Sequence, residues 1–212
     1  SVAVGLEPVA VAVNGDKAWV VNHVSDTVSI VDLAVYPQRT IRTLLVGDEP
    51  RDIVFAGTNF NRAFITTAHR GQNSPVDPQS VIPAKGRADV WVFDVNKLGA
   101  SLGGEPETIV TLFADTPRAL AVSPDGSKVF AAAFHSGNKT TAVHQVSNAL
   151  KATPDTTSQG VEAPLTGYIF QFRDGHWRDE ANNIFDDKAK INLPDYDVFT
   201  LDAASTQVTE IA

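Results

Sequence analysis

A strand-turn-strand unit that opens with proline occurs three times in this chain, and this repeat constrains the fold more than any other feature. The three copies span residues 8–22, 50–67 and 117–134. In each copy two short apolar runs flank a turn that contains glycine or asparagine, such as the Ser-Pro-Asp-Gly turn at residues 123–126. Such a turn leaves both arms too short for a helix, so the pattern predicts a β-hairpin.

The spacing of the three units predicts how the hairpins assemble. Pro8, Pro50 and Pro117 lie 42 and 67 residues apart. A period near ~40 residues with several short strands in each period is typical of β-propeller blades. The longer second interval indicates an insertion, which the many glycines, prolines and polar residues place at residues 69–87. A long loop on a regular scaffold is where a binding function tends to lie.

We therefore predict an all-β propeller segment with about three and a half four-stranded blades. The predicted boundaries are 4–46 for the first blade, 47–113 for the second, 114–177 for the third and 191–212 for the start of a fourth. Residues 141–146 are expected to form the third strand of blade three. Closed propellers need about four to eight blades. The remaining blades are expected from a longer parent chain or from a second chain, because an open blade exposes an apolar face.

Composition narrows the range of partners. The sequence has 212 residues, a formal net charge of −8 and a pI near 5.0, which argues against nucleic acid or an anionic membrane as a partner. No apolar run approaches the ~18 residues of a membrane span. The absence of cysteine excludes disulfides, thiolate catalysis and cysteine-based zinc sites. Because the sequence also lacks methionine, we expect a processed chain or part of a longer one.

The repeats resemble the YVTN-type β-propeller proteins of archaeal surface layers and the bacterial periplasm. The resemblance rests on glycine three residues before Pro8 and Pro50, on the Ala-Trp-Val-Val-Asn run at 18–22, and on residues 25–32. Residues 67–73, 115–122 and 193–199 look like a bacterial subgroup with long inserted loops. The resemblance implies a periplasmic or extracellular location and the N-terminal half of a ring of about seven blades. Some relatives carry cytochrome c domains, which are therefore a candidate partner, and the family shares no catalytic residues.

Three histidines are candidate metal ligands. His23, His69 and His135 each follow the second apolar run of a unit, at the end where acidic links enter the next strand. Adjacent blades would bring these imidazoles and the carboxylates of Glu7, Asp48, Glu49 and Asp115 to one mouth of the central channel. Such a set would suit a transition metal such as zinc, copper or iron. The alternative is that they are solvated loop residues.

Two arginines and three loop residues are candidate ligand-binding groups. Arg51 and Arg118 each follow a strand-opening proline, where they would bind an anion or pair with nearby carboxylates. Further candidates lie in the loops 69–87 and 135–140: Arg70, Asn73 and Asn138.

Two functions remain open from the sequence. The first is a non-catalytic propeller module of the periplasm or cell surface that presents its loops to a protein or small ligand. The second is a metal- or haem-associated redox or hydrolytic propeller with the histidines at the channel mouth. No serine-nucleophile or phosphate-loop motif is present, so an enzymatic function depends on the histidines alone.

Overall fold

The computed structural model describes residues 1–68, 88–112, 114–135, 140–144, 156–162, 167–189 and 196–211. The chain divides into two compact units, Ser1–Ser136 with Tyr196–Ala212, and Gly137–Asp195. Both units contain antiparallel sheets, and the helical structure within the described ranges is a 3₁₀ turn at Thr58–Phe60. In these ranges no helix has the length and apolar character needed to cross a membrane.

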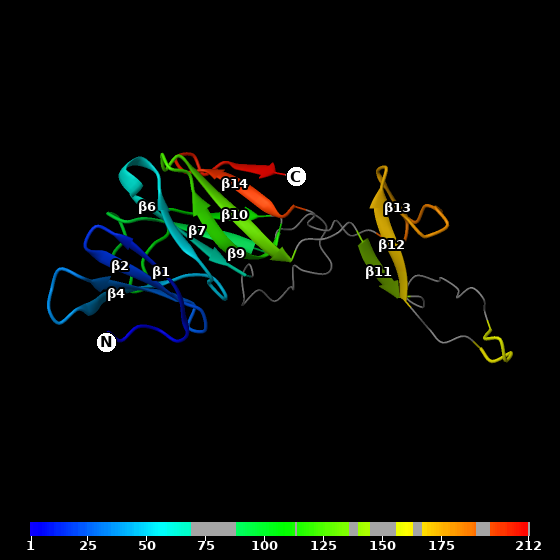
Figure 1. The fold of residues 1–212 in the computed structure, drawn as a ribbon, viewed down its shortest axis with the longest axis horizontal. Helices are drawn as coiled ribbons and strands as arrows, with labels where there is room; N and C mark the ends of the chain where they lie inside the picture. Colours follow the sequence, from blue (N-terminus) through cyan, green and yellow to red (C-terminus); the bar gives the residue numbers. More distant parts are fainter. Residues whose placement is uncertain are drawn as a thin grey trace. The chain divides into compact units, whose positions relative to one another are not determined.

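Blades one and two are four-stranded sheets in which each strand pairs with the next (Figure 1). Their bounds follow the sequence prediction to within a few residues. Blade one consists of β1 (Pro8–Asn14), β2 (Lys17–Asn22), β3 (Thr27–Asp32) and β4 (Arg39–Leu45). Blade two consists of β5 (Ile53–Ala56), β6 (Arg62–Thr67), β7 (Ala88–Asp94) and β8 (Thr108–Leu112).

Blade three corrects the predicted boundaries. It is built from β9 (Asp115–Val122), β10 (Lys128–His135), β14 (Val198–Asp202) and β15 (Val208–Ile211), in the order β15-β14-β10-β9. The predicted fourth blade at 191–212 is therefore wrong, because β14 pairs directly with β10. Those residues complete blade three, and the sequence between β10 and β14 is an insertion into that blade.

The three blades stack through their faces, which makes this unit a segment of a β-propeller. The first strands β1, β5 and β9 are successive neighbours. One apolar core lies between blades one and two and contains Trp19, Ile30 and Phe55; a second core, with Phe64 and Phe199, lies between blades two and three. Both faces of blade two are buried, which explains why its strands are almost continuously apolar.

The aspartate that ends each third strand has the same structural role in all three blades. The side chain of Asp32 accepts a hydrogen bond from the backbone N–H two residues later, at 3.0 Å, and those of Asp94 and Asp202 do the same at 2.9 and 3.0 Å. Each aspartate also lies opposite the basic residue that opens the second strand. These Asx-turns end the strands, so the repeated aspartates form part of the blade and carry no catalytic signal.

The second unit, Gly137–Asp195, has a sheet of its own. Its strands are β11 (Thr140–His144), β12 (Gly167–Arg173) and β13 (His176–Arg178), paired in that order. The prediction that residues 141–146 belong to blade three is wrong, because Thr140–His144 pairs with β12. The predicted hairpin from β12 through Asp174-Gly175 to β13 is present. A small core of Val143, Phe170, Trp177 and Ala189 holds this unit together.

Candidate functional site

One end of the blades contains His23, the backbone of His135 and the links between successive blades. We call it the link face, defined by the links 5–7, 47–49 and 114–116 that enter the first strands. The backbone N–H of His23 donates to the Glu7 carbonyl at 2.9 Å, and that of Ala68 donates to the Asp48 carbonyl at 2.8 Å. In blade three His135 lies opposite Asp115. Second strands therefore end where links begin, as the repeat predicted.

The residue before each strand-opening proline has a left-handed backbone in all three blades. The φ angles are 54° at Glu7, 47° at Glu49 and 51° at Thr116. This conformation is uncommon for residues other than glycine. Strain of this kind at one position would suggest a functional site. Because it recurs at the equivalent position of every blade, it belongs to the way the link enters the strand.

The three histidines differ in position and in what the structure describes. In blade one, Asn22 lies opposite the strand-opening Pro8, so His23 comes one residue after the position opposite the proline. In blade three, Ala133 lies opposite Pro117, so His135 comes two residues after that position. The two histidines are thus not equivalent, contrary to the sequence prediction. His69 lies outside the described residues, as does the side chain of His135.

His23 has a local partner at the boundary between two blades. Its Nδ1 atom lies 3.3 Å from the carbonyl oxygen of Pro50, and the side chain is half-buried. Among the described residues, no group of three histidine, aspartate or glutamate side chains is arranged to hold a metal ion. The metal site at the channel mouth, which requires His69, stays a prediction.

Arg51 and Arg118 use their guanidinium groups in different ways. The Nη2 atom of Arg51 is 3.8 Å from the Glu49 carboxylate, and a quarter of the Arg51 side chain is exposed. Arg118 is exposed, and its guanidinium carbon lies 4.0 Å from the centre of the Phe134 ring. Arg118 is the more accessible candidate for anion binding. Arg70, Asn73 and Asn138 lie outside the described residues.

A carboxylate that was not singled out from the sequence joins blades two and three. Asp52 accepts a hydrogen bond from the Leu120 backbone N–H at 2.7 Å through one oxygen and from the Ile53 N–H at 2.8 Å through the other. Its own backbone N–H donates to the Thr66 hydroxyl at 3.1 Å. Both carboxylate oxygens of Asp52 are used within the blades, so its role is to tie two first strands together.

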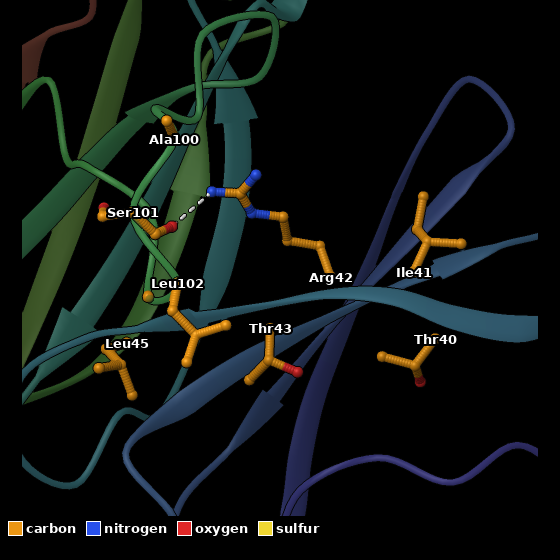
Figure 2. Close-up of a pocket in the computed structure, with 9 residues that line it drawn as sticks. Thr40, Ile41, Arg42, Thr43, Leu45, Ala100, Ser101 and Leu102 are labelled. Atoms are coloured by element: carbon orange, nitrogen blue, oxygen red, sulfur yellow. Dashed lines mark hydrogen bonds between the residues drawn. The ribbon is translucent and has the colours of Figure 1, made fainter.

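The rim between blades one and two contains a groove of about 610 Å³ (Figure 2). One wall is the outermost strand β4 and the other is the segment 100–103 of blade two; nine residues line it, Thr40, Ile41, Arg42, Thr43, Leu45, Ala100, Ser101, Leu102 and Gly103. Leu102 is 98% exposed. No sequence signal pairs these two segments, because they are brought together only by the stacking of the blades.

Arg42 fixes the geometry of this groove. Its Nη2 atom donates to the backbone carbonyls of Leu98, Gly99 and Ser101 at 3.2, 2.9 and 2.9 Å, and Figure 2 shows the guanidinium directed at the last of these. The Leu45 N–H also donates to the Gly103 carbonyl at 2.8 Å. Arg42, the charged residue among those that line the groove, therefore uses its guanidinium group to hydrogen-bond backbone carbonyls. The other lining residues contribute apolar and hydroxyl surface, and none has a side chain suited to acid-base catalysis.

The connections between second and third strands differ sharply among the blades. In blade one this connection is the short segment 23–26, whereas in blade two it is 68–87 and in blade three it is 136–197, which contains the second unit. All three connections leave from the link face, because the second strands end there. Long insertions in two adjacent blades thus begin at the same face.

No known family model and no curated protein matches the sequence. Solved structures that are similar include hydrazine synthase from Kuenenia stuttgartiensis, with 16% identity over 96% of this chain and 53% of that chain, at a TM-score of 0.46. A functionally unknown protein from Desulfotomaculum acetoxidans has 13% identity over 76% of this chain and 43% of that chain, at a TM-score of 0.43. The WD40 domain of Toxoplasma gondii coronin has 9% identity over 95% of this chain and 43% of that chain, at a TM-score of 0.41.

This chain spans about half the length of these three solved chains or less. WD40 domains are β-propellers. The strand order and the face-to-face stacking of the blades identify this unit as a propeller segment.

Proposed function

We propose that this chain is a binding module of the periplasm or cell surface and belongs to the YVTN-type propeller repeat proteins. In this proposal the blades are a rigid scaffold, and the inserted segments of blades two and three bind a protein partner or a small ligand. The module functions within a longer or multi-chain assembly, for which a cytochrome c domain is one candidate partner.

The observation that carries the proposal is the placement of the two insertions. Both replace the same connection, which blade one makes with residues 23–26 alone. An insertion of this length costs stability, because ordering its backbone loses conformational entropy. Two such insertions that begin at one face, one of them with its own apolar core, favour a recognition function. The repeat pattern and the lack of cysteine support an envelope location.

Exchanging the insertions tests this function without dismantling the blades. Residues 137–195 are replaced by the four-residue blade-one connection, His-Val-Ser-Asp, and residues 68–87 are replaced in the same way in a second variant. Because β10 pairs with β14 and β6 pairs with β7, both variants should keep the propeller unit folded, as measured by far-UV circular dichroism. The expected result is that a partner retained by the full chain from a periplasmic extract is lost by at least one variant.

A matched control changes the opposite end of the blades. Exchange of the blade-three turn 123–127 for the blade-one turn 14–16 leaves the link face untouched, so the partner should remain bound. Equal retention of the partner by the folded insertion variants would show that binding does not use these segments.

A further inference from the structure

A pocket of about 440 Å³ lies in the seam between blades one and two, and we call it the seam pocket. Blade one contributes Asp16 in the turn between its first two strands, Lys17 at the start of β2 and, deeper, Trp19. Blade two contributes the connection that follows β7, including Asn96 and Leu98. Both walls belong to blades that pack on each other within this chain. The pocket lies at the turn end of the blades, opposite the link face.

Hydrogen bonds between the two blades fix the width of the seam pocket. The side-chain amide of Asn14 donates to the Phe60 carbonyl of blade two at 2.7 Å. The Nη2 atom of Arg42 donates to the carbonyls of Leu98 and Gly99 at 3.2 and 2.9 Å. Asn14, Arg42 and Leu98 all line the pocket, so its walls are set before a ligand binds. A preformed site loses less conformational entropy on binding.

The charged side chains of the seam pocket already have partners. The Nζ atom of Lys17 lies 2.9 Å from the Asp16 carboxylate and 3.0 Å from that of Asp32. The hydrogen bonds with Asp16 and Asp32 raise the pKa of Lys17, so its ammonium group stays charged. An anion would have to bind beside these carboxylates, and a cation beside the ammonium of Lys17 and the guanidinium of Arg42. The electrostatics of the pocket therefore favour a neutral ligand.

Three polar groups of the pocket remain available to such a ligand. Lys17 has three N–H donors and uses two of them for the carboxylates. The second carboxylate oxygen of Asp16 and the side-chain amide of Asn96 have no partner among the described residues, and both side chains are exposed. A hydroxyl group both donates and accepts. Because the Asp16 and Lys17 groups are adjacent, two neighbouring hydroxyls of one ligand can bond both of them.

The rest of the pocket wall is apolar. Trp19 and Ile30 form its base and are each 3% exposed. Ile41, which is 46% exposed, and the half-buried Leu98 offer apolar surface to a ligand. Burial of C–H groups against such surface is favourable. The pocket thus combines an apolar wall with a polar edge that suits neighbouring hydroxyls, and a pyranose ring has this same combination of C–H face and hydroxyl edge.

We propose that the seam pocket binds a neutral sugar. Two vicinal hydroxyls bond Asp16 and Lys17, and a further hydroxyl bonds the side-chain amide of Asn96. The C–H face of the ring lies on Ile41 and Leu98. The volume is near the lower end of the ~300–1,000 Å³ of small-molecule sites, which suits a single ring better than a long oligosaccharide. This inference is independent of the proposed function, because the inserted segments begin at the opposite end of the blades.

An NMR titration of the full, ¹⁵N-labelled chain with glucose, galactose, mannose and N-acetylglucosamine tests the site. The indole N–H groups of the tryptophans give signals of their own, and Trp19 lines the pocket whereas Trp177 belongs to the second unit. We expect at least one of these sugars to shift the Trp19 indole and Asn96 amide signals in a saturable way. The Trp177 indole signal should not move.

Two variants and a matched control locate the binding. Asp16→Ala and Asn96→Ala each remove hydrogen bonds to the sugar and should raise its dissociation constant about 10-fold or more. Both positions are exposed, so both variants should fold, as checked by far-UV circular dichroism. Lys97→Ala is the control, because the Lys97 side chain is adjacent in sequence, is 84% exposed and does not line the pocket. This variant should bind the sugar as the wild type does.

Glycerol and inorganic phosphate serve as competing probes in the same titration. Glycerol has vicinal hydroxyls without a ring, so shifts as large as those from the sugars would show that no ring is recognised and would overturn the proposal. Saturable shifts of the Trp19 signal with phosphate would overturn the assignment of a neutral ligand. The proposal also fails if none of the sugars moves the Trp19 signal at high millimolar concentration, or if Asn96→Ala binds them with unchanged affinity.

Discussion

Substitution of Gly47 by alanine tests whether the link that enters blade two packs directly against the sheet of that blade. A Cβ atom at this position would lie 2.8 Å from Nε1 of Trp91 and 3.0 Å from the Thr67 hydroxyl oxygen, closer than side chains normally approach. Both neighbours belong to the stacked sheet of blade two, so the link must move or the sheet must yield. The glycine in the repeated Gly-x-x-Pro pattern is therefore required for close packing.

The expected cost follows from two opposing effects. Overpacking of a well-packed region costs about 1–3 kcal/mol. Replacing glycine by alanine also restricts the unfolded chain, which offsets about 0.4–1 kcal/mol. We therefore expect Gly47→Ala to lower the free energy of unfolding by about 1–2 kcal/mol, measured by urea denaturation with far-UV circular dichroism.

Blade three provides the matched background for this experiment. It has Ala114 at the position of Gly47, Ala133 at the position of Thr67 and Phe199 at the position of Trp91. Ala114 is 1% exposed, so this blade accommodates a Cβ atom that blade two excludes. In a chain that already carries Thr67→Ala and Trp91→Phe, Gly47→Ala should cost less than about 0.5 kcal/mol. The same loss of stability in both backgrounds would refute the steric explanation.

Three further predictions concern the pKa of Asp125, the hydrogen bonds of Asp52 and the metal content of the chain. Hydrogen bonds from the Ser123 and Ser127 hydroxyls and the Ser127 N–H hold the pKa of Asp125 at about 2, so the stability contributed by this ionised group is present above its unfolded pKa and is lost as pH falls through about 2; Ser123→Ala should raise this pKa in an NMR titration, and an unchanged pKa would contradict the assignment. Asp52→Ala should lower the free energy of unfolding by about 1–3 kcal/mol in urea denaturation, because it leaves the Leu120 N–H without its carboxylate partner, whereas a cost below about 0.5 kcal/mol would show that Asp52 does not join the blades. Elemental analysis of the natively purified chain should find no stoichiometric metal, and one equivalent that disappears on replacing the three candidate histidines by alanine would establish the metalloprotein function instead.

Much of the fold could be read from the repeat because each blade is built from local patterns. The strands of blades one and two fall within a few residues of their predicted bounds, and the turn at 123–126 is where its proline and glycine place it. The gathering of second-strand ends and links at one face also follows from the repeat. Strand, turn and repeat are properties of short segments, so one sequence is enough to predict them.

The candidate site was less predictable, because it depends on register. His23 and His135 lie six and seven residues after the basic residues Lys17 and Lys128 that open their strands. Only the register shows that both hairpins have the same bulge beside the proline, so that this difference of one residue places the two histidines at different positions. The rim groove could not be predicted either, because β4 and the segment around Leu102 belong to different blades and meet only when the blades stack. Side chains that meet only through stacking leave no periodic signal.

The sequence by itself determined that this chain forms antiparallel four-stranded blades, where most of their strands lie and where long connections interrupt them. Only the tertiary structure decided that β14 returns to β10 across an insertion that forms a compact unit of its own, and that β4 and the segment around Leu102 meet at one groove. The physical reason is that strand formation follows from alternation and turn chemistry over a few residues. Pairing between strands separated by a long insertion depends instead on which apolar faces are available to be covered.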